Sequence, residues 1–311
     1  MSLKHPIIAL TGSSGAGSSI ATKVFEYIFR RERVKAVYIQ GSAFHRYDRK
    51  QMLQEVRKAE KEGRVLSHYG PDANHLDKLE NLFFEYAAIG KGKSRYYLHS
   101  SEVAEKWGQE AGTLTPWKEL PKNSDLLVYR GLHGAAIYND IDISQYPDLL
   151  IGIVPNINLE WIRKIKRDCA LRGYTEQEIQ QSIIDRMKDY VHHITPQFSR
   201  THVNFQMIPL VDTSNPFTMR DIPAREECHL IIHFQNIETP DFEKYLKIIP
   251  KSFMSNSKSI VVPGSQMAYS FEVMMMPIIH ELIDKSRAIR KVHKKPKKKK
   301  SGLLGTLSQS G

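Results

Sequence analysis

Residues 7–19 limit the possible folds of this chain more than any other segment, because an apolar run leads directly into glycines and small hydroxyl residues. The run at 7–10 is short and wholly apolar, as in a parallel strand buried on both faces. Gly12, Gly15 and Gly17 permit a tight turn in which consecutive backbone N–H groups converge on phosphate oxygens. The spacing of Gly12 and Gly17 is that of G-x-x-x-x-G-K-[ST], with Ser18 in place of the lysine. A plain strand-to-helix turn is the alternative, and the order of the elements favours phosphate binding.

The predicted nucleotide-binding residues are Gly12, Ser13, Ser14, Gly15, Ala16, Gly17, Ser18 and Ser19. The hydroxyl of Ser19 stands where a phosphate loop ligates magnesium. An amphipathic helix is expected to follow, with Ile20, Val24, Tyr27 and Ile28 facing the sheet.

Composition narrows the class of protein. The 311 residues, 41% hydrophobic and 25% charged, are typical of a globular protein with a sizeable core. No apolar run reaches 18 residues, and the first strand begins too early to leave room for a signal peptide, so neither a membrane span nor secretion is expected. Cys169 and Cys228 form neither a metal cluster nor a disulfide framework, which favours the cytoplasm.

Positive charge is concentrated near the C-terminus. Residues 287–300 hold nine of the 45 Lys and Arg residues and no acid, which leaves 36 basic against 34 acidic residues elsewhere. The body is therefore not expected to bind nucleic acid by charge. We expect a folded domain over 1–286 and a disordered basic tail over 287–311. That tail is interpreted as a solvated end, as a contact for polyanions such as RNA or anionic lipid, or as a localisation signal.

The remaining hydrophobic pattern alternates strands with helices, which predicts an α/β fold with a mostly parallel sheet flanked by helices. Further strands are expected at 36–39, 126–129, 149–154, 208–211, 230–234 and 260–262. Helices are expected at 48–62, 76–89, 159–171, 176–192 and 267–286.

A series of short motifs carries a resemblance to a known family. The motifs are TGSSGAG at 11–17, AFHR at 43–46, RYYLH at 95–99, GLHG at 131–134, NLEWI at 158–162, RGY at 172–174, PQFS at 196–199 and VDTSNPF at 211–217. Together they closely resemble the bacterial type of phosphoribulokinase over nearly all of residues 1–285.

The resemblance implies a P-loop kinase fold that transfers the γ-phosphoryl group of ATP, with Mg²⁺, to the 1-hydroxyl of ribulose 5-phosphate. It also implies a cytoplasmic homo-oligomer, commonly an octamer. By resemblance, the residues around the sugar phosphate are His45, Arg49, Tyr97, His99, Lys164, Arg167 and Arg172. Bacterial members of the family are often activated by NADH through arginines. Arg31 matches one of these positions, whereas His233 and Asn256 stand where the other two arginines are expected, so the effector site is incomplete.

Two positions depart from the family pattern. Ser42 stands where the family has its aspartate general base, and Arg130 stands where the family has a glutamate that serves the magnesium. A serine hydroxyl is no usable base at neutral pH, and the loss of a general base typically costs about 10²–10⁴ in rate. A guanidinium repels a divalent cation, although it can pair directly with phosphate. Ser42, Arg130, Lys164 and Asp168 are therefore the expected catalytic positions of an enzyme that is impaired or inactive.

The alternative is an active phosphoribulokinase that uses a relocated carboxylate, for which Asp168 and Asp48 are the candidates. Lys164, Asp168 and Arg172 are spaced to share one ridge of a helix, and Asp48 is placed to cap the next helix. A third interpretation makes the tail the functional part and the body an oligomeric scaffold.

Overall fold

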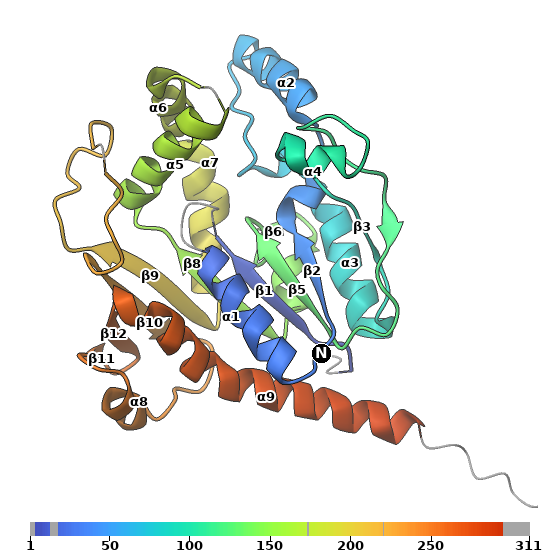
Figure 1. Cartoon of the computed structure of the whole chain (residues 1–311). Helices are drawn as coiled ribbons and strands as arrows, with labels where there is room; N and C mark the ends of the chain where they lie inside the picture. Colours follow the sequence, from blue (N-terminus) through green and yellow to red (C-terminus); the bar gives the residue numbers. More distant parts are fainter. Residues whose placement is uncertain (1–3, 13–17, 173, 220, 295–311) are drawn as a thin grey trace, which may run out of the picture.

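The computed structural model describes residues 4–12, 18–172, 174–219 and 221–294, without the side chains of 18–20, 171, 172 and 292–294. An eight-stranded sheet runs through it in the order β11-β12-β10-β9-β8-β1-β5-β2 (Figure 1). Five adjacent strands are parallel, namely β1 (Ile7–Thr11), β2 (Ala36–Gln40), β5 (Leu126–Gly131), β8 (Leu149–Val154) and β9 (Val203–Pro209). Three antiparallel strands complete it, namely β10 (Cys228–Phe234), β11 (Phe253–Asn256) and β12 (Ser259–Pro263).

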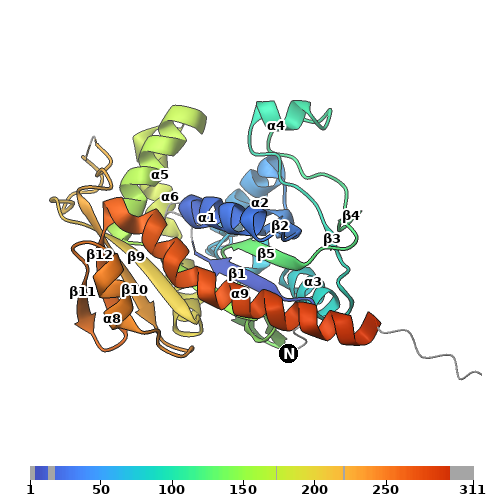
Figure 2. The ribbon, with the colours of Figure 1, turned by 60° about the horizontal axis from the view of Figure 1, so that its bottom comes forward.

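Helices cover both faces of the sheet. The helices α1 (Ser18–Arg31) and α9 (Met267–Lys294) lie side by side on one face and share a core with β10 and β12 (Figure 2). The helix α3 (Leu76–Ile89) packs on the other face, against β1, β2 and β5. The predicted class, a mostly parallel α/β sheet flanked by helices, is confirmed.

The inward face of α1 differs from the one expected. Val24 and Ile28 are buried as predicted, but Tyr27 is 54% exposed, and Phe25 and Phe29 fill the core instead. A face centred on residues 21, 25 and 28 follows the same helical period, so the period alone did not distinguish the two faces. The aromatic ring of Tyr27 lies under the Arg31 guanidinium at the surface.

Smaller elements surround the carboxyl edge of the parallel strands. The helices there are α2 (Arg49–Lys61), α4 (Ser101–Glu105), α5 (Ile157–Arg172), α6 (Glu176–Asp185) and α7 (Met187–Asp189), followed by a π-turn at Tyr190–Ile194. The expected single helix over 176–192 is thus wrong, because it breaks after Asp185. The other elements are α8 (Phe242–Ile248), the hairpin strands β3 (Lys93–Ser94), β4 (Lys118–Glu119), β6 (Ile137–Tyr138) and β7 (Ile141–Asp142), and 3₁₀ turns at Gly41–Phe44, Pro71–Ala73, Ile143–Gln145, Thr195–Ser199 and Gly264–Gln266.

Two boundaries also move. The strand expected at 208–211 is β9, whose side chains alternate from Val203, so that Val203, Phe205 and Met207 point into the core. The last helix continues beyond residue 286 to Lys294, into the segment 287–311 that was expected to be a disordered tail. Arg290 anchors this extension, because its Nε donates to the Lys4 carbonyl at 2.7 Å and its Nη1 pairs with Asp125 at 3.1 Å. Residues 295–311 lie outside the described part of the chain.

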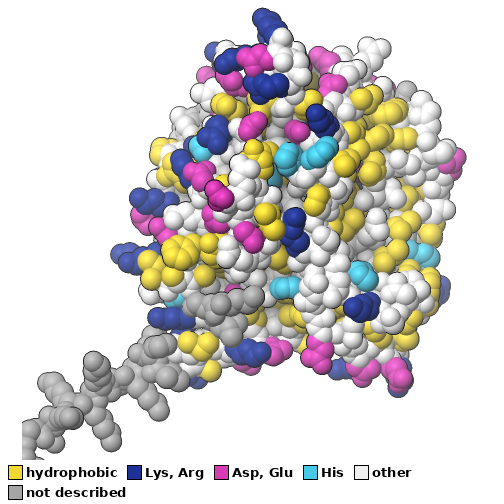
Figure 3. Space-filling model, turned by 180° about the vertical axis from the view of Figure 1, so that it is seen from behind, with side chains coloured by type: hydrophobic (Ala, Val, Ile, Leu, Met, Phe, Trp, Pro, Cys, Tyr) yellow, Lys and Arg dark blue, Asp and Glu magenta, His cyan; other side chains and the backbone are white. Residues whose placement is uncertain are grey.

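Charged side chains of both signs are interspersed on the face seen in Figure 3, in agreement with the near balance of charge outside the basic run. Within the described ranges, no helix is both long enough and apolar enough to cross a bilayer.

Candidate functional site

The carboxyl ends of β1, β5 and β2 meet at the start of the glycine-rich loop. The amide of Gly12 donates to the carbonyl of Gly131 at 3.0 Å, and Gly41 packs against the Cα of Gly131. Gly12 has φ of +150°, and a Cβ there would lie 2.3 Å from the carbonyl oxygen of Ile153, so only glycine fits. Of the predicted nucleotide-binding residues, Ser13 to Gly17 lie outside the described residues, as do the side chains of Ser18 and Ser19. Their roles stay predictions.

A buried glutamine joins the strand ends at this edge. Gln197, 1% exposed, accepts from the Thr11 hydroxyl at 2.9 Å and from the Ala135 amide at 3.1 Å. Its own amide donates to the carbonyls of Leu132 at 2.8 Å and His193 at 2.7 Å. The PQFS motif contains this residue, but its linking role was missed, because no sequence pattern pairs positions so far apart.

Ser42 lies in the 3₁₀ turn that follows β2, and its Oγ is 3.2 Å from Nε2 of His99. The ring of Tyr97 lies 4.6 Å from that of His99, and Arg49 donates to the His99 carbonyl at 3.0 Å. The ring of His45 contacts Tyr97 at 5.6 Å. The structure therefore brings together Ser42 and four residues predicted for the sugar side of the site. Hydroxyl, phenol and imidazole groups are suited to hydrogen-bond sugar hydroxyls.

Two histidines of this cluster, His45 and His68, are partly buried and uncharged at neutral pH. Nδ1 of His45 is 3.1 Å from Oδ1 of Asn74, and its ring lies 4.0 Å from that of His68. Burial lowers the pKa of His45 to about 4 and holds the pKa of His68 well below its usual value. His68 was not predicted. It follows a predicted helix as an isolated residue and gives no periodic signal.

Asp168 is held between two cations on α5. Its carboxylate, 2% exposed, pairs with Lys164 at 3.0 Å and with Arg167 at 2.7 Å. Burial by itself would raise the pKa of Asp168, but the hydrogen bond from Arg167 and the charge of Lys164 outweigh it and keep the pKa below its usual value. The predicted ridge is confirmed for Lys164 and Asp168, whereas the side chain of Arg172 lies outside the described part. A carboxylate held in this way is a poor proton acceptor.

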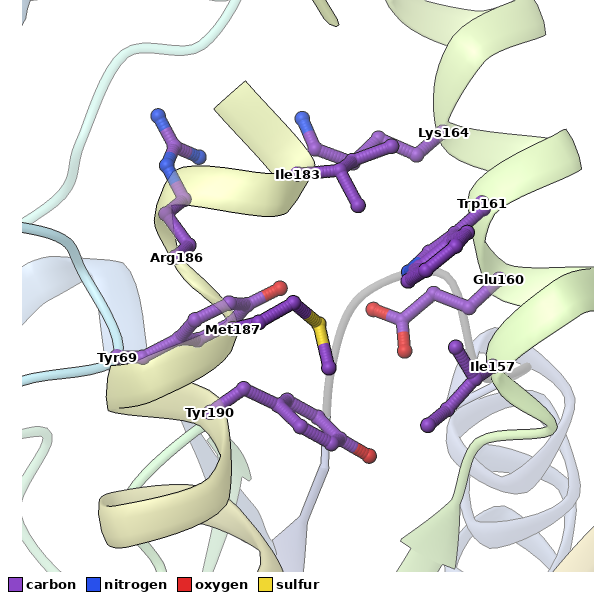
Figure 4. A pocket seen from close by; sticks show the side chains of 9 residues that line it. All are labelled: Tyr69, Ile157, Glu160, Trp161, Lys164, Ile183, Arg186, Met187 and Tyr190. Carbon is purple, nitrogen blue, oxygen red and sulfur yellow. The ribbon is translucent and has the colours of Figure 1, made fainter. Parts of the chain in front are cut away.

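A shallow pocket lies between α5 and the segment of α6 and α7 (Figure 4). Its lining residues are Tyr69, Ile157, Glu160, Trp161, Lys164, Ile183, Arg186, Met187 and Tyr190. Of these only Lys164 was predicted. The others combine aromatic walls with Glu160 and Arg186. The lining residues come from three separate stretches of the sequence, at 69, 157–164 and 183–190, which explains why no local motif revealed them.

Arg130 is the penultimate residue of β5 and lies on the sheet face that α1 covers. Its Nη1 donates to the Thr22 hydroxyl of α1 at 3.4 Å, and burial lowers the pKa of its guanidinium, which the charge of Glu26 offsets in part. Among the described residues, no group of three or more His, Cys, Asp or Glu side chains is arranged to hold a metal ion. The positively charged guanidinium of Arg130 lies at the strand end instead, so the described side chains at this edge do not fit a resident Mg²⁺.

Arg31 lies at the opposite end of α1 from the loop. It pairs with Glu32 at 3.2 Å and with Glu272 of α9 at 3.5 Å. Nδ1 of His233 is 2.7 Å from the Ser259 hydroxyl. The effector role of Arg31 stays a prediction.

Comparison with known proteins gives consistent matches over most of the chain. The model of the Phosphoribulokinase / Uridine kinase family matches residues 7–214. The chromosomal phosphoribulokinase of Cupriavidus necator is 50% identical over 288 residues, which are 92% of this chain and 99% of the relative. A probable phosphoribulokinase of Escherichia coli is 46% identical over 284 residues, 91% of this chain and 98% of the relative. The solved structure of phosphoribulokinase from Rhodobacter spheroides superposes with a TM-score of 0.85 at 44% identity, covering 92% of this chain and 100% of that one.

Proposed function

Because the chain belongs to the phosphoribulokinase / uridine kinase family, we propose that it binds nucleotide and sugar phosphate at the carboxyl edge of its sheet but transfers the phosphoryl group inefficiently. The reaction concerned is ATP plus ribulose 5-phosphate to ADP plus ribulose 1,5-bisphosphate. The clustering of His45, Arg49, Tyr97 and His99 around Ser42 supports the sugar-binding part of this proposal.

The guanidinium of Arg130 at the end of β5 is the observation that carries the proposed impairment. Phosphoryl transfer depends on positioning the phosphates and on neutralising their charge. When bound, Mg²⁺ would supply both, as a template and as a Lewis acid. With a cation already at this edge and no cluster of metal-ligating side chains among the described residues, the site is poorly suited to hold that ion.

Ser42 adds a second loss. Its hydroxyl is able to orient the sugar through hydrogen bonding, and its contact with His99 keeps it in place. It does not take up a proton at neutral pH, so the rate contribution of a general base, about 10²–10⁴, is missing.

The alternative, an active kinase with a relocated carboxylate, has less support. Asp48 caps α2, where its carboxylate accepts from the Gln51 amide at 2.8 Å in a capping box. Asp168 is already paired with two cations and has a lowered pKa. Both candidate carboxylates therefore have structural partners.

A coupled assay with ATP, Mg²⁺ and ribulose 5-phosphate tests the proposal. The unmodified chain is compared with the double variant Ser42→Asp/Arg130→Glu and with Ser101→Asp/Arg57→Glu, which makes the same changes at exposed positions. We expect turnover in the first double variant only, at least about 10²-fold above the other two proteins. Efficient product formation by the unmodified chain would refute the impairment, and Asp168→Asn and Asp48→Asn would then identify the replacement base.

We also propose, from the resemblance and composition, a cytoplasmic homo-oligomer with a polyanion contact through its basic C-terminal residues. Light scattering of the full chain measures the assembly, for which an octamer is expected. Heparin binding before and after deletion of 295–311 tests the contact. Unchanged binding after the deletion would exclude these residues as the contact.

A further inference from the structure

Arg130 has a half-buried guanidinium to which the described part of the chain offers few partners. Its one hydrogen bond there, to the Thr22 hydroxyl, is long at 3.4 Å. No carboxylate of the described residues forms an ion pair with it. The acid whose charge acts on it is Glu26, an exposed residue one turn further along α1. A guanidinium has five N–H donors, and burying a charge without a counterion is costly. This arrangement calls for an anionic ligand.

The strand alternation fixes where that ligand would lie. Leu126 and Val128 are buried beneath α1, so Arg130 projects from the same face, just beyond the end of the core. The next residue, Gly131, accepts the hydrogen bond of Gly12. The guanidinium thus lies between the beginning of α1 and the point where the chain leaves β1.

We infer that Arg130 binds a phosphate oxyanion that carries no divalent metal, and that the ligand is a metal-free nucleoside triphosphate. This inference rests on the proposed function, since nucleotide binding is assumed there. A guanidinium pairs with phosphate through two parallel N–H···O bonds. A Mg²⁺ on the same phosphate oxygens would face a like charge, so the Mg²⁺ complex of the nucleotide binds less well.

Isothermal titration of the full chain tests this with four ligands. These are ATP in EDTA, ATP in excess Mg²⁺, ribulose 5-phosphate in EDTA and inorganic phosphate in EDTA. The variants are Arg130→Gln, Arg130→Lys and Lys23→Gln. Lys23→Gln is the control, because it removes an exposed positive charge from α1, the helix that covers Arg130. Circular dichroism verifies that each variant is folded.

The unmodified chain is expected to bind ATP about tenfold or more tightly in EDTA than in Mg²⁺, since a Mg²⁺ on the same oxygens would compete with the charge-assisted hydrogen bonds of the guanidinium. Arg130→Gln is expected to abolish this preference and to weaken the binding of metal-free ATP by about 10–100-fold. Arg130→Lys keeps the charge but loses the paired geometry, and therefore lies in between. Lys23→Gln changes the affinity less than about threefold, as expected of an exposed charge.

Three outcomes would overturn the inference. Equal or tighter binding of the Mg²⁺ complex, with nucleotide clearly bound, refutes it and leaves the proposed function intact. If phosphate or ribulose 5-phosphate binds in an Arg130-dependent way and ATP binding does not depend on Arg130, then Arg130 binds the phosphate group of a ligand other than a nucleotide. That result refutes the assignment of a nucleotide as the ligand. If no nucleotide binds to the unmodified chain or to any of the three variants, with or without Mg²⁺, the nucleotide part of the proposed function fails together with the inference.

Discussion

Replacing Gln197 by alanine removes the side chain that links the ends of β1 and β5 to the turn before β9. Four hydrogen bonds are lost, namely those from Thr11 and Ala135 and those to Leu132 and His193. The site is fully buried, so water has little access to replace them.

The cost follows from this count. Each intramolecular hydrogen bond contributes about 1 kcal/mol net, which gives about 4 kcal/mol for the set. The Thr11 hydroxyl also reaches the carbonyl of Leu132, at 3.3 Å, so two of the groups keep a partner. We therefore expect the free energy of unfolding to fall by about 3 kcal/mol, a large part of the roughly 5–15 kcal/mol typical of a folded domain.

Equilibrium unfolding in urea, followed by tryptophan fluorescence and by far-UV circular dichroism, measures the change. Coincidence of the two transitions justifies the two-state fit. Gln181→Ala is the matched control, because the amide of Gln181 donates to Asp185 at 2.7 Å on an exposed helix surface. Its loss should cost less than about 0.5 kcal/mol.

Gln197→Met separates hydrogen bonding from packing, since methionine retains most of the side-chain volume. It should retain about 1 kcal/mol more stability than the alanine variant. A loss in Gln197→Ala of less than about 1 kcal/mol, or no larger than that in Gln181→Ala, would contradict the assignment of a linking role to this side chain.

Three further predictions concern pH, charge and close packing. Burial lowers the pKa of His133 to about 4, so the folded state takes up its proton less readily than the unfolded state. The stability that His133 contributes above about pH 6.5 is therefore lost as the pH falls towards 4, and His133→Gln should flatten the dependence of the unfolding free energy on pH. Asp168→Ala leaves two partly buried cations without their carboxylate and should cost about 3 kcal/mol in urea unfolding; a loss below about 1 kcal/mol would exclude a strong pair. Gly264→Ala would place its Cβ 2.2 Å from the carbonyl oxygen of Arg225, which is backbone and cannot swing away, so thermal unfolding should show a loss of about 1–3 kcal/mol. An unchanged melting temperature would mean that the backbone around Arg225 shifts to admit the Cβ at little cost.

Local patterns predicted most of the regular elements. The helix over 76–89 has the predicted bounds, because its apolar period ends at Gly90, whose φ of +68° forms the C-cap. Asp48 caps α2 as expected from its position before the helical pattern. The pair of Lys164 and Asp168 follows from i, i+4 spacing. Each of these features depends on residues a few positions apart.

The inaccurate expectations have a common cause. Tyr27 satisfies the period of α1, but Phe25 is buried against Phe271 of α9, which lies more than 200 residues later in the chain. The extension of α9 to Lys294 depends on Arg290 meeting Lys4 and Asp125. No local pattern records such contacts.

The site divides in the same way. Contiguous motifs in the sequence were sufficient to predict the glycine-rich loop, the departures at Ser42 and Arg130, and the family. They were sufficient because backbone turns and strand ends need particular residue types at short spacing. Three features of the site depend on segments that meet only when the parallel strands pair. They are the approach of His99 to Ser42, the partners of Gln197 and the half-buried position of the Arg130 guanidinium against α1. The pairing of parallel strands joins distant segments through crossover connections, so the chemistry at their carboxyl ends is decided by the tertiary structure.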